Sequence, residues 1–97
     1  MRNFEEIKSV LSAHKDELKE KYGIDQIGLF GSYTKENQKI NSDIDILVDF
    51  KKVIDLLTFV HVKNYLSELL NINVDLVMRK ALKPNIGAKI LKETVYI

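Results

Sequence analysis

The feature that most constrains this 97-residue chain is an apolar run, residues 43–50, that carries aspartates at alternate positions. Alternation with a period of two is typical of a β-strand, because successive side chains point to opposite faces. Asp43 and Asp45 therefore project from the same face, on the order of 7 Å apart. Two carboxylates at this spacing repel each other, and burial would force one of them to take up a proton. A bound divalent cation removes this conflict.

A third aspartate, Asp75, interrupts a second apolar run over residues 72–78. A lone charge in such a strand is costly unless it is paired or bound to a metal. If the two strands are neighbours, Asp75 joins Asp43 and Asp45 in a cluster of three carboxylates. Magnesium prefers oxygen ligands and is commonly held by one or two carboxylates together with substrate phosphates. Such a cluster would hold two ions roughly 3.5–4 Å apart, the spacing that serves phosphoryl transfer.

Asp49 lies on the same predicted strand face as Asp45 but farther along, beside Lys51 and Lys52. Its position at the end of the strand and its basic neighbours predict a solvated residue. We therefore expect Asp49 to take no part in the acidic cluster.

A Gly-Ser turn precedes the acidic strand. Residues 24–30 are predicted to form a short strand, which Gly31 and Ser32 end. Glycine lets the backbone approach a ligand closely, and Ser32 stands where the N-cap of a helical turn over residues 33–38 is expected. Amide groups at a helix start bind anions such as phosphate. For the turn and the carboxylates to reach one ligand, the strands over residues 24–30 and 43–50 should be antiparallel neighbours.

Three segments show the pattern of helices. The first runs from Phe4 to Lys21, with Asn3 as N-cap and Gly23 at its end. The second runs from about residue 54 to residue 70, and its apolar positions cover more than one face. A helix that is apolar so far round must bury a second side, and another chain is the candidate that we expect to cover it. A short helix over residues 85–92 comes last.

The order of these elements predicts a single α/β (α+β) domain over residues 1–97, in which helices pack on a small mixed sheet of three to four strands. The chain has no cysteine, which excludes disulfides and thiol chemistry. No apolar run approaches the length of a membrane span, and the acidic N-terminal residues do not resemble a signal peptide. We therefore expect a cytoplasmic protein without a membrane contact. Fifteen Lys and Arg against fourteen Asp and Glu give no broad basic face, so direct nucleic-acid binding is not expected.

The turn and the aspartates together resemble the signature of the DNA polymerase β-type nucleotidyltransferase superfamily. The resemblance is closest to its minimal nucleotidyltransferase (MNT) branch of small stand-alone domains, and it covers nearly the whole chain. The residues that carry it are Gly31, Ser32, Ser42, Asp43, Asp45 and Asp75. It implies a polymerase β-like fold and the transfer of a nucleotidyl group from a nucleoside triphosphate to a hydroxyl, with release of pyrophosphate and two magnesium ions.

The resemblance also implies roles for single residues. Asp43 and Asp45 would bind both metal ions, and Asp75 would serve the ion that activates the acceptor hydroxyl. These three are therefore the expected catalytic residues and metal ligands.

Nucleotide binding is expected at the turn. Gly31 and Ser32 would hold the β- and γ-phosphates, and Lys35 and Ser42 complete the predicted nucleotide-binding set. Many relatives have Arg-Gly where this chain has Lys35 and Glu36. Lysine binds phosphate as a point charge but lacks the two-pronged fork of arginine, and Glu36 adds negative charge near the triphosphate.

MNT domains are typically encoded beside an all-helical HEPN toxin with ribonuclease activity. The resemblance thus implies an antitoxin that transfers AMP from ATP to a tyrosine of that toxin. Larger members of the superfamily carry a helical half that supplies the acceptor surface. Since this chain ends at Ile97, we expect a partner protein, or a second copy of the chain, to complete the pocket. Two alternatives stay open: a catalytically silent antitoxin that blocks its HEPN partner by binding, and an enzyme that acts on a small molecule with a helical subunit.

Overall fold

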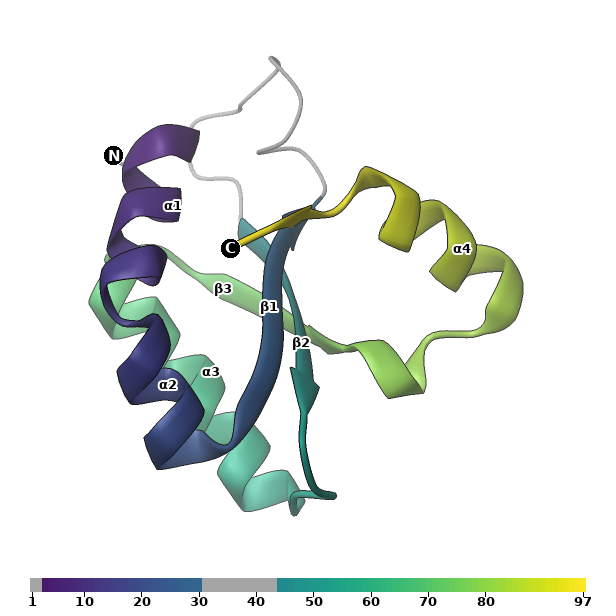
Figure 1. Cartoon of the computed structure of the whole chain (residues 1–97), viewed down its shortest axis with the longest axis horizontal. Helices are drawn as coiled ribbons and strands as arrows, with labels where there is room; N and C mark the ends of the chain where they lie inside the picture. The colour runs from purple at the N-terminus through teal and green to yellow at the C-terminus, as the bar shows by residue number, and fades with distance from the viewer. Residues whose placement is uncertain (1–2, 31–43) are drawn as a thin grey trace.

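The computed structural model of the chain describes residues 3–30 and 44–97, which form a four-stranded sheet with helices packed on it (Figure 1). The mixed α/β fold predicted from the sequence is confirmed. The elements, in chain order, are α1 (Phe4–Ala13), α2 (Lys15–Tyr22), β1 (Ile24–Phe30), β2 (Ile44–Phe50), α3 (Leu56–Leu70), β3 (Val74–Met78), the 3-10 helix η2 (Arg79–Ala81), α4 (Pro84–Glu93) and β4 (Val95–Tyr96).

The strands lie in the order β3-β2-β1-β4. β1 and β2 are antiparallel neighbours, as predicted from the sequence, whereas β2 and β3 are parallel. The two-residue strand β4 was not predicted, because it is too short to show a period, and it pairs with β1 at Gly28. A Cβ atom on Gly28 would lie 2.5 Å from Cγ2 of Thr94. Only glycine at this position lets the C-terminal strand approach so closely.

The two faces of the sheet have different surroundings. Helices α1, α2 and α3 lie on one side of the sheet and α4 on the other (Figure 1). We call the side toward α1–α3 the core face, where β2 contributes Ile44, Ile46 and Val48, all fully buried. The opposite side is the outer face, to which the period of two assigns Asp45 and Asp49. The alternation seen in the sequence therefore separates the core from the acidic residues.

The first predicted helix is wrong in one respect: it is two helices, which meet at His14. The backbone of His14 has φ −104° and ψ 6°, outside the helical range. The amide of His14 is shared between the carbonyl oxygens of Val10 and Leu11, and its ring Nδ1 lies 2.9 Å from the carbonyl oxygen of Val10. A side chain that bonds to the preceding turn in this way competes with the regular helix ladder. Gly23, in the left-handed conformation, ends α2 as predicted.

Helix α3 is buried over only part of its surface. Val62, Leu66 and Leu70 are fully buried against the core, whereas Leu56 and Leu57 in the first turn are 75% and 82% exposed. The second apolar side expected from the sequence therefore lies at the surface, and its burial against another chain stays a prediction. α3 is 15 residues long, and no helix within residues 3–30 and 44–97 is long and apolar enough to cross a membrane.

Candidate functional site

Two of the three predicted catalytic aspartates are brought side by side. In the parallel pairing of β2 with β3, Asp45 is the register partner of Asp75. Neighbouring strands lie about 4.8 Å apart, and register partners point to the same face. Both carboxylates therefore leave the outer face at the same level. Asp45 is half-buried and Asp75 is exposed, so a ligand can reach the pair from solvent.

The end of β1 lies at the same level. Phe30 is the register partner of Asp45 across the antiparallel pair. The C-terminal end of β1 is thus next to Asp45, which is the strand arrangement that the sequence predicted. The remaining predicted site residues lie outside the described part of the chain: Gly31, Ser32, Lys35, Ser42 and Asp43.

The donor set of the pair fits a hard cation. Asp45 and Asp75 present carboxylate oxygens from adjacent strands, and like charges at this spacing favour a bound cation between them. Within residues 3–30 and 44–97 no group of three or more His, Cys, Asp or Glu side chains is placed to hold a metal ion. The third predicted ligand, Asp43, falls in the undescribed segment. The three-carboxylate cluster and its magnesium ions therefore stay a prediction. Two of the three carboxylates, those of Asp45 and Asp75, are on adjacent strands.

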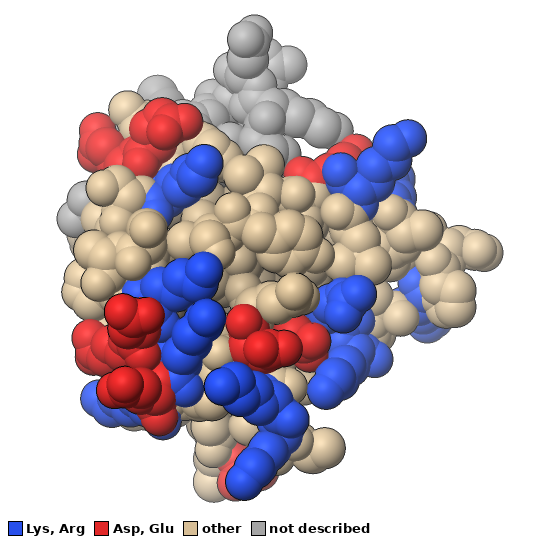
Figure 2. All heavy atoms as spheres, viewed as in Figure 1, with Lys and Arg blue, Asp and Glu red and all other residues tan. Residues whose placement is uncertain are grey.

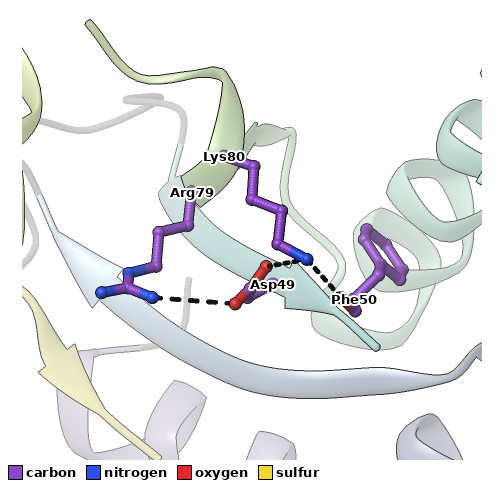
Figure 3. Close-up of polar contacts among 4 residues, drawn as sticks. All are labelled: Asp49, Phe50, Arg79 and Lys80. Carbon is purple, nitrogen blue, oxygen red and sulfur yellow. Dashed lines mark hydrogen bonds and ion pairs between the residues drawn. The ribbon is translucent and has the colours of Figure 1, made fainter. Parts of the chain in front are cut away.

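Asp49 differs from its sequence-based prediction. Rather than a solvated strand end, it is a buried carboxylate, 8% exposed. Nη1 of Arg79 and Nζ of Lys80 each lie 3.8 Å from one of its oxygens (Figure 3). Lys80 also donates a hydrogen bond of 3.4 Å to the carbonyl oxygen of Phe50. The prediction failed because two cations from a distant segment replace the water that Asp49 would otherwise need.

These ion pairs tie together the parts that carry the catalytic candidates. Arg79 and Lys80 form the start of η2, directly after the strand that bears Asp75, and Asp49 belongs to the strand that bears Asp45. The contact therefore joins the C-terminal ends of β2 and β3. Its sequence signal is faint: two basic residues follow an apolar strand, and an aspartate shares the Asp45 face. Nothing in the local pattern connects positions that are 30 residues apart.

The fold and the paired carboxylates together indicate a nucleotidyltransferase. Residues 11–97 match the model of the nucleotidyltransferase domain family, and the chain belongs to that family. It is similar to the protein adenylyltransferase MntA of Thermococcus cleftensis, with 48% identity over 97 residues, which is the whole of this chain and 98% of that protein. A second relative, assigned as a protein adenylyltransferase of Methanocaldococcus jannaschii, is 45% identical over the full length of both chains.

Solved structures share the same fold. The structure of a protein assigned as a minimal nucleotidyltransferase superposes with a TM-score of 0.82 and 28% identity, covering 97% of this chain and 95% of that one. A toxin–antitoxin structure with AMP-PNP gives a TM-score of 0.72 and 26% identity, covering 87% of this chain and 69% of that one. The resemblance to the minimal nucleotidyltransferases that the sequence suggested is thus confirmed, and the enzyme class with it.

Proposed function

We propose that this chain is a protein adenylyltransferase that transfers AMP from ATP to a tyrosine hydroxyl of a partner HEPN toxin and so acts as its antitoxin. The observation that carries the proposal is the register pairing of Asp45 with Asp75 on the outer face. Two comparisons support it: a relative named a protein adenylyltransferase at 48% identity, and a similar fold solved in a toxin–antitoxin structure with AMP-PNP.

The proposed reaction is an in-line displacement at the α-phosphorus of ATP. The acceptor oxygen forms a bond to that phosphorus, the bond to the pyrophosphate oxygen breaks with its electron pair staying on pyrophosphate, and the acceptor proton passes to solvent water. Asp45 and Asp75, together with Asp43, would hold two magnesium ions. When bound, these ions lower the pKa of the acceptor hydroxyl and neutralise the leaving pyrophosphate. The role of the three aspartates would be to position the two magnesium ions.

The openness of the site suits a macromolecular acceptor. Asp75 is exposed, and it lies on a sheet edge strand that has no further strand beyond it in the described sheet. A hydroxyl on the surface of a partner protein can approach such a site without entering an enclosed pocket. The proposal puts this activity in the cytoplasm, with the partner completing the site.

The test is transfer of label from α-³²P-ATP in the presence of magnesium. The purified chain is incubated with the product of the neighbouring gene, and the labelled residue is identified by mass spectrometry. We expect label on a tyrosine of the partner, lost in Asp75→Asn and kept in Asp25→Asn, a matched change at an exposed aspartate of β1. Absence of label with both proteins folded would contradict the enzyme.

The same experiment separates catalysis from blocking by contact. If Asp75→Asn still neutralises the partner's toxicity as well as the unchanged protein does, the chain is an antitoxin that acts by binding. If label appears on a small molecule and on no protein, the acceptor class is wrong.

A further inference from the structure

The C-terminal part of the chain is strongly basic. No Asp or Glu occurs between Asp75 and Glu93. The basic residues in that interval are Arg79, Lys80, Lys83, Lys89 and Lys92. Figure 2 shows Lys and Arg side chains over the α4 side of the molecule, on the right, whereas acidic and basic side chains are interspersed over α1 and α2, on the left. A near-neutral chain therefore has a basic end.

A groove of about 330 Å³ lies within this basic region, between the η2 segment and α4. Helix α4 approaches closely here because residue 87 is glycine: a Cβ on Gly87 would lie 3.0 Å from Cβ of Leu82. The side chains that give the groove its character are the apolar Leu82, Ala88 and Leu91 and the basic Arg79, Lys80 and Lys83. The groove thus combines an apolar lining with positive charge.

The groove is linked to the same sheet face as the catalytic candidates. Arg79 and Lys80 reach Asp49 on the outer face of β2 (Figure 3). Asp49 follows Asp45 by four residues on that face, a separation of about 13 Å along a strand. Two residues of the groove, Arg79 and Lys80, therefore border the sheet face that carries Asp45.

The charge in the groove is only partly compensated by the protein. Within residues 3–30 and 44–97, the carboxylate that pairs with Arg79 and Lys80 is that of Asp49, and the two cationic side chains are 46% and 64% exposed. Lys83, also on the groove, is exposed. An occupant that carries negative charge is favoured, and the apolar lining favours one that also carries aliphatic side chains. Among the residues of the described ranges no aromatic side chain lines the groove, and these residues offer no stacking platform of the kind typical of single-stranded nucleic-acid sites.

We infer that the groove between η2 and α4 binds an acidic, aliphatic segment of the acceptor protein and thereby presents its hydroxyl to Asp45 and Asp75. This inference rests on the proposed function, since it describes the protein that receives AMP. It states a property of that acceptor: an acidic, aliphatic segment accompanies the modified hydroxyl.

The test is the binding of short fluorescent peptides to the full chain, measured by anisotropy without ATP. One peptide carries a tyrosine, several glutamates and leucines, and the other has every glutamate replaced by glutamine. We expect the glutamate peptide to bind about tenfold more tightly, with the difference shrinking as salt is added. Equal affinity for the two peptides would overturn the inference.

Two matched variants locate the binding. Lys83→Glu reverses an exposed charge that lines the groove. Lys63→Glu reverses the charge of an exposed lysine on α3. We expect Lys83→Glu to weaken the glutamate peptide about fivefold and Lys63→Glu to change it less than about twofold. An equal effect of both variants would contradict the inference. An RNA oligonucleotide that displaces the peptide and binds more tightly would assign the groove to nucleic acid instead.

The outcome can be separated from that of the proposed function. Peptide binding that depends on Lys83, without AMP transfer to any protein, supports the groove and contradicts the enzyme. AMP transfer to the partner, with peptide binding indifferent to Lys83, does the reverse. Circular dichroism of each variant confirms that it is folded.

Discussion

Two aspartates of one strand, Asp45 and Asp49, share a face of the sheet and have opposite environments. Asp45 has another carboxylate, Asp75, as its register partner. Asp49 lies between two cations from η2 and is buried. Two cations of η2 compensate the buried Asp49, whereas Asp45 and Asp75 together present the carboxylate oxygens that a hard cation prefers. The identity of the neighbour, and not the residue type, thus separates a structural acid from a candidate catalytic one.

The same strand also contrasts its two faces. Ile46, next to Asp45, is fully buried in the core with α1, α2 and α3 behind it. Burial of such a side chain contributes on the order of 2 kcal/mol to folding. One strand therefore contributes to the core with one face and carries a candidate catalytic residue on the other.

The largest effect is expected at Asp45. Asp45→Asn should reduce AMP transfer on the order of a thousandfold, because charge stabilisation by a bound metal is worth several kcal/mol. The free energy of unfolding should change much less than in a core substitution, because Asp45 lies on the outer face and is only half-buried. Label transfer and urea unfolding measure the two quantities. A loss of stability together with activity would assign Asp45 to the structure.

The reverse pattern is expected at the next residue. Ile46→Ala should lower the free energy of unfolding by about 2–4 kcal/mol, because it removes a fully buried side chain from the core. At a temperature where the variant is still folded, its transfer rate should be much closer to that of the unchanged protein than the rate of Asp45→Asn. Chemical unfolding and the label assay on the folded variant test this. A stability change below about 0.5 kcal/mol would mean that the core is not as described.

A smaller effect is expected at Asp49. Asp49→Asn should cost about 1 kcal/mol of stability, because Arg79 and Lys80 lose their counterion but reach solvent and are screened there. The cost should fall at high salt. Urea unfolding at low and high salt provides the measurement, with Asp25→Asn as the control. An Asp49→Asn variant as stable as the unchanged protein would show that the ion pairs contribute nothing.

The smallest effect concerns the helix that covers the core face. Hydrogen bonds from Thr58, first from its side chain and then from its backbone amide, lower the pKa of Asp55 below its ordinary value of 3.8. The hydrogen bond that the backbone amide of Thr58 donates to Oδ1 of Asp55, 2.7 Å long, caps α3. Because the pKa of Asp55 is lower in the folded state, its ionised form stabilises the protein at a pH above the ordinary pKa. This contribution to stability is lost as the pH falls through the pKa of the folded state.

The matched variant for this titration is Asp55→Asn, since asparagine caps equally well and does not titrate. Thermal unfolding at neutral and acidic pH should show a smaller decline in melting temperature for Asp55→Asn than for the unchanged chain. Identical declines in melting temperature would show that titration of Asp55 does not contribute to the pH dependence of stability.

Local periodicity in the sequence predicted most of the strands and the face that each residue takes. It placed Asp45 and the core isoleucines correctly, and functional geometry predicted that β1 and β2 are antiparallel. Local periodicity did not predict β4, because that strand depends on a close approach at Gly28. It also did not predict the break between α1 and α2, because the break depends on the side chain of His14 bonding to the turn before it. The burial of Asp49 was missed because its partners come from another part of the chain.

Within the site, the sequence predicted that Asp75 would be brought beside the acidic strand, and the structure places it opposite Asp45. The roles of Gly31, Ser32, Lys35, Ser42 and Asp43 stay predictions, because these residues lie outside the described part of the chain. The basic groove was not predicted, because the net charge of +1 does not reveal an uneven distribution of charge along the chain.

The central claim is that Asp45 and Asp75 serve one cation site, and metal titration tests it most directly. Binding of Mn²⁺, a spectroscopic substitute for magnesium, is followed by electron paramagnetic resonance in the presence of a non-hydrolysable ATP analogue. We predict that Asp45→Asn and Asp75→Asn each weaken Mn²⁺ binding at least about tenfold, with Asp25→Asn unchanged. Mn²⁺ binding that is the same in all four proteins would contradict the claim.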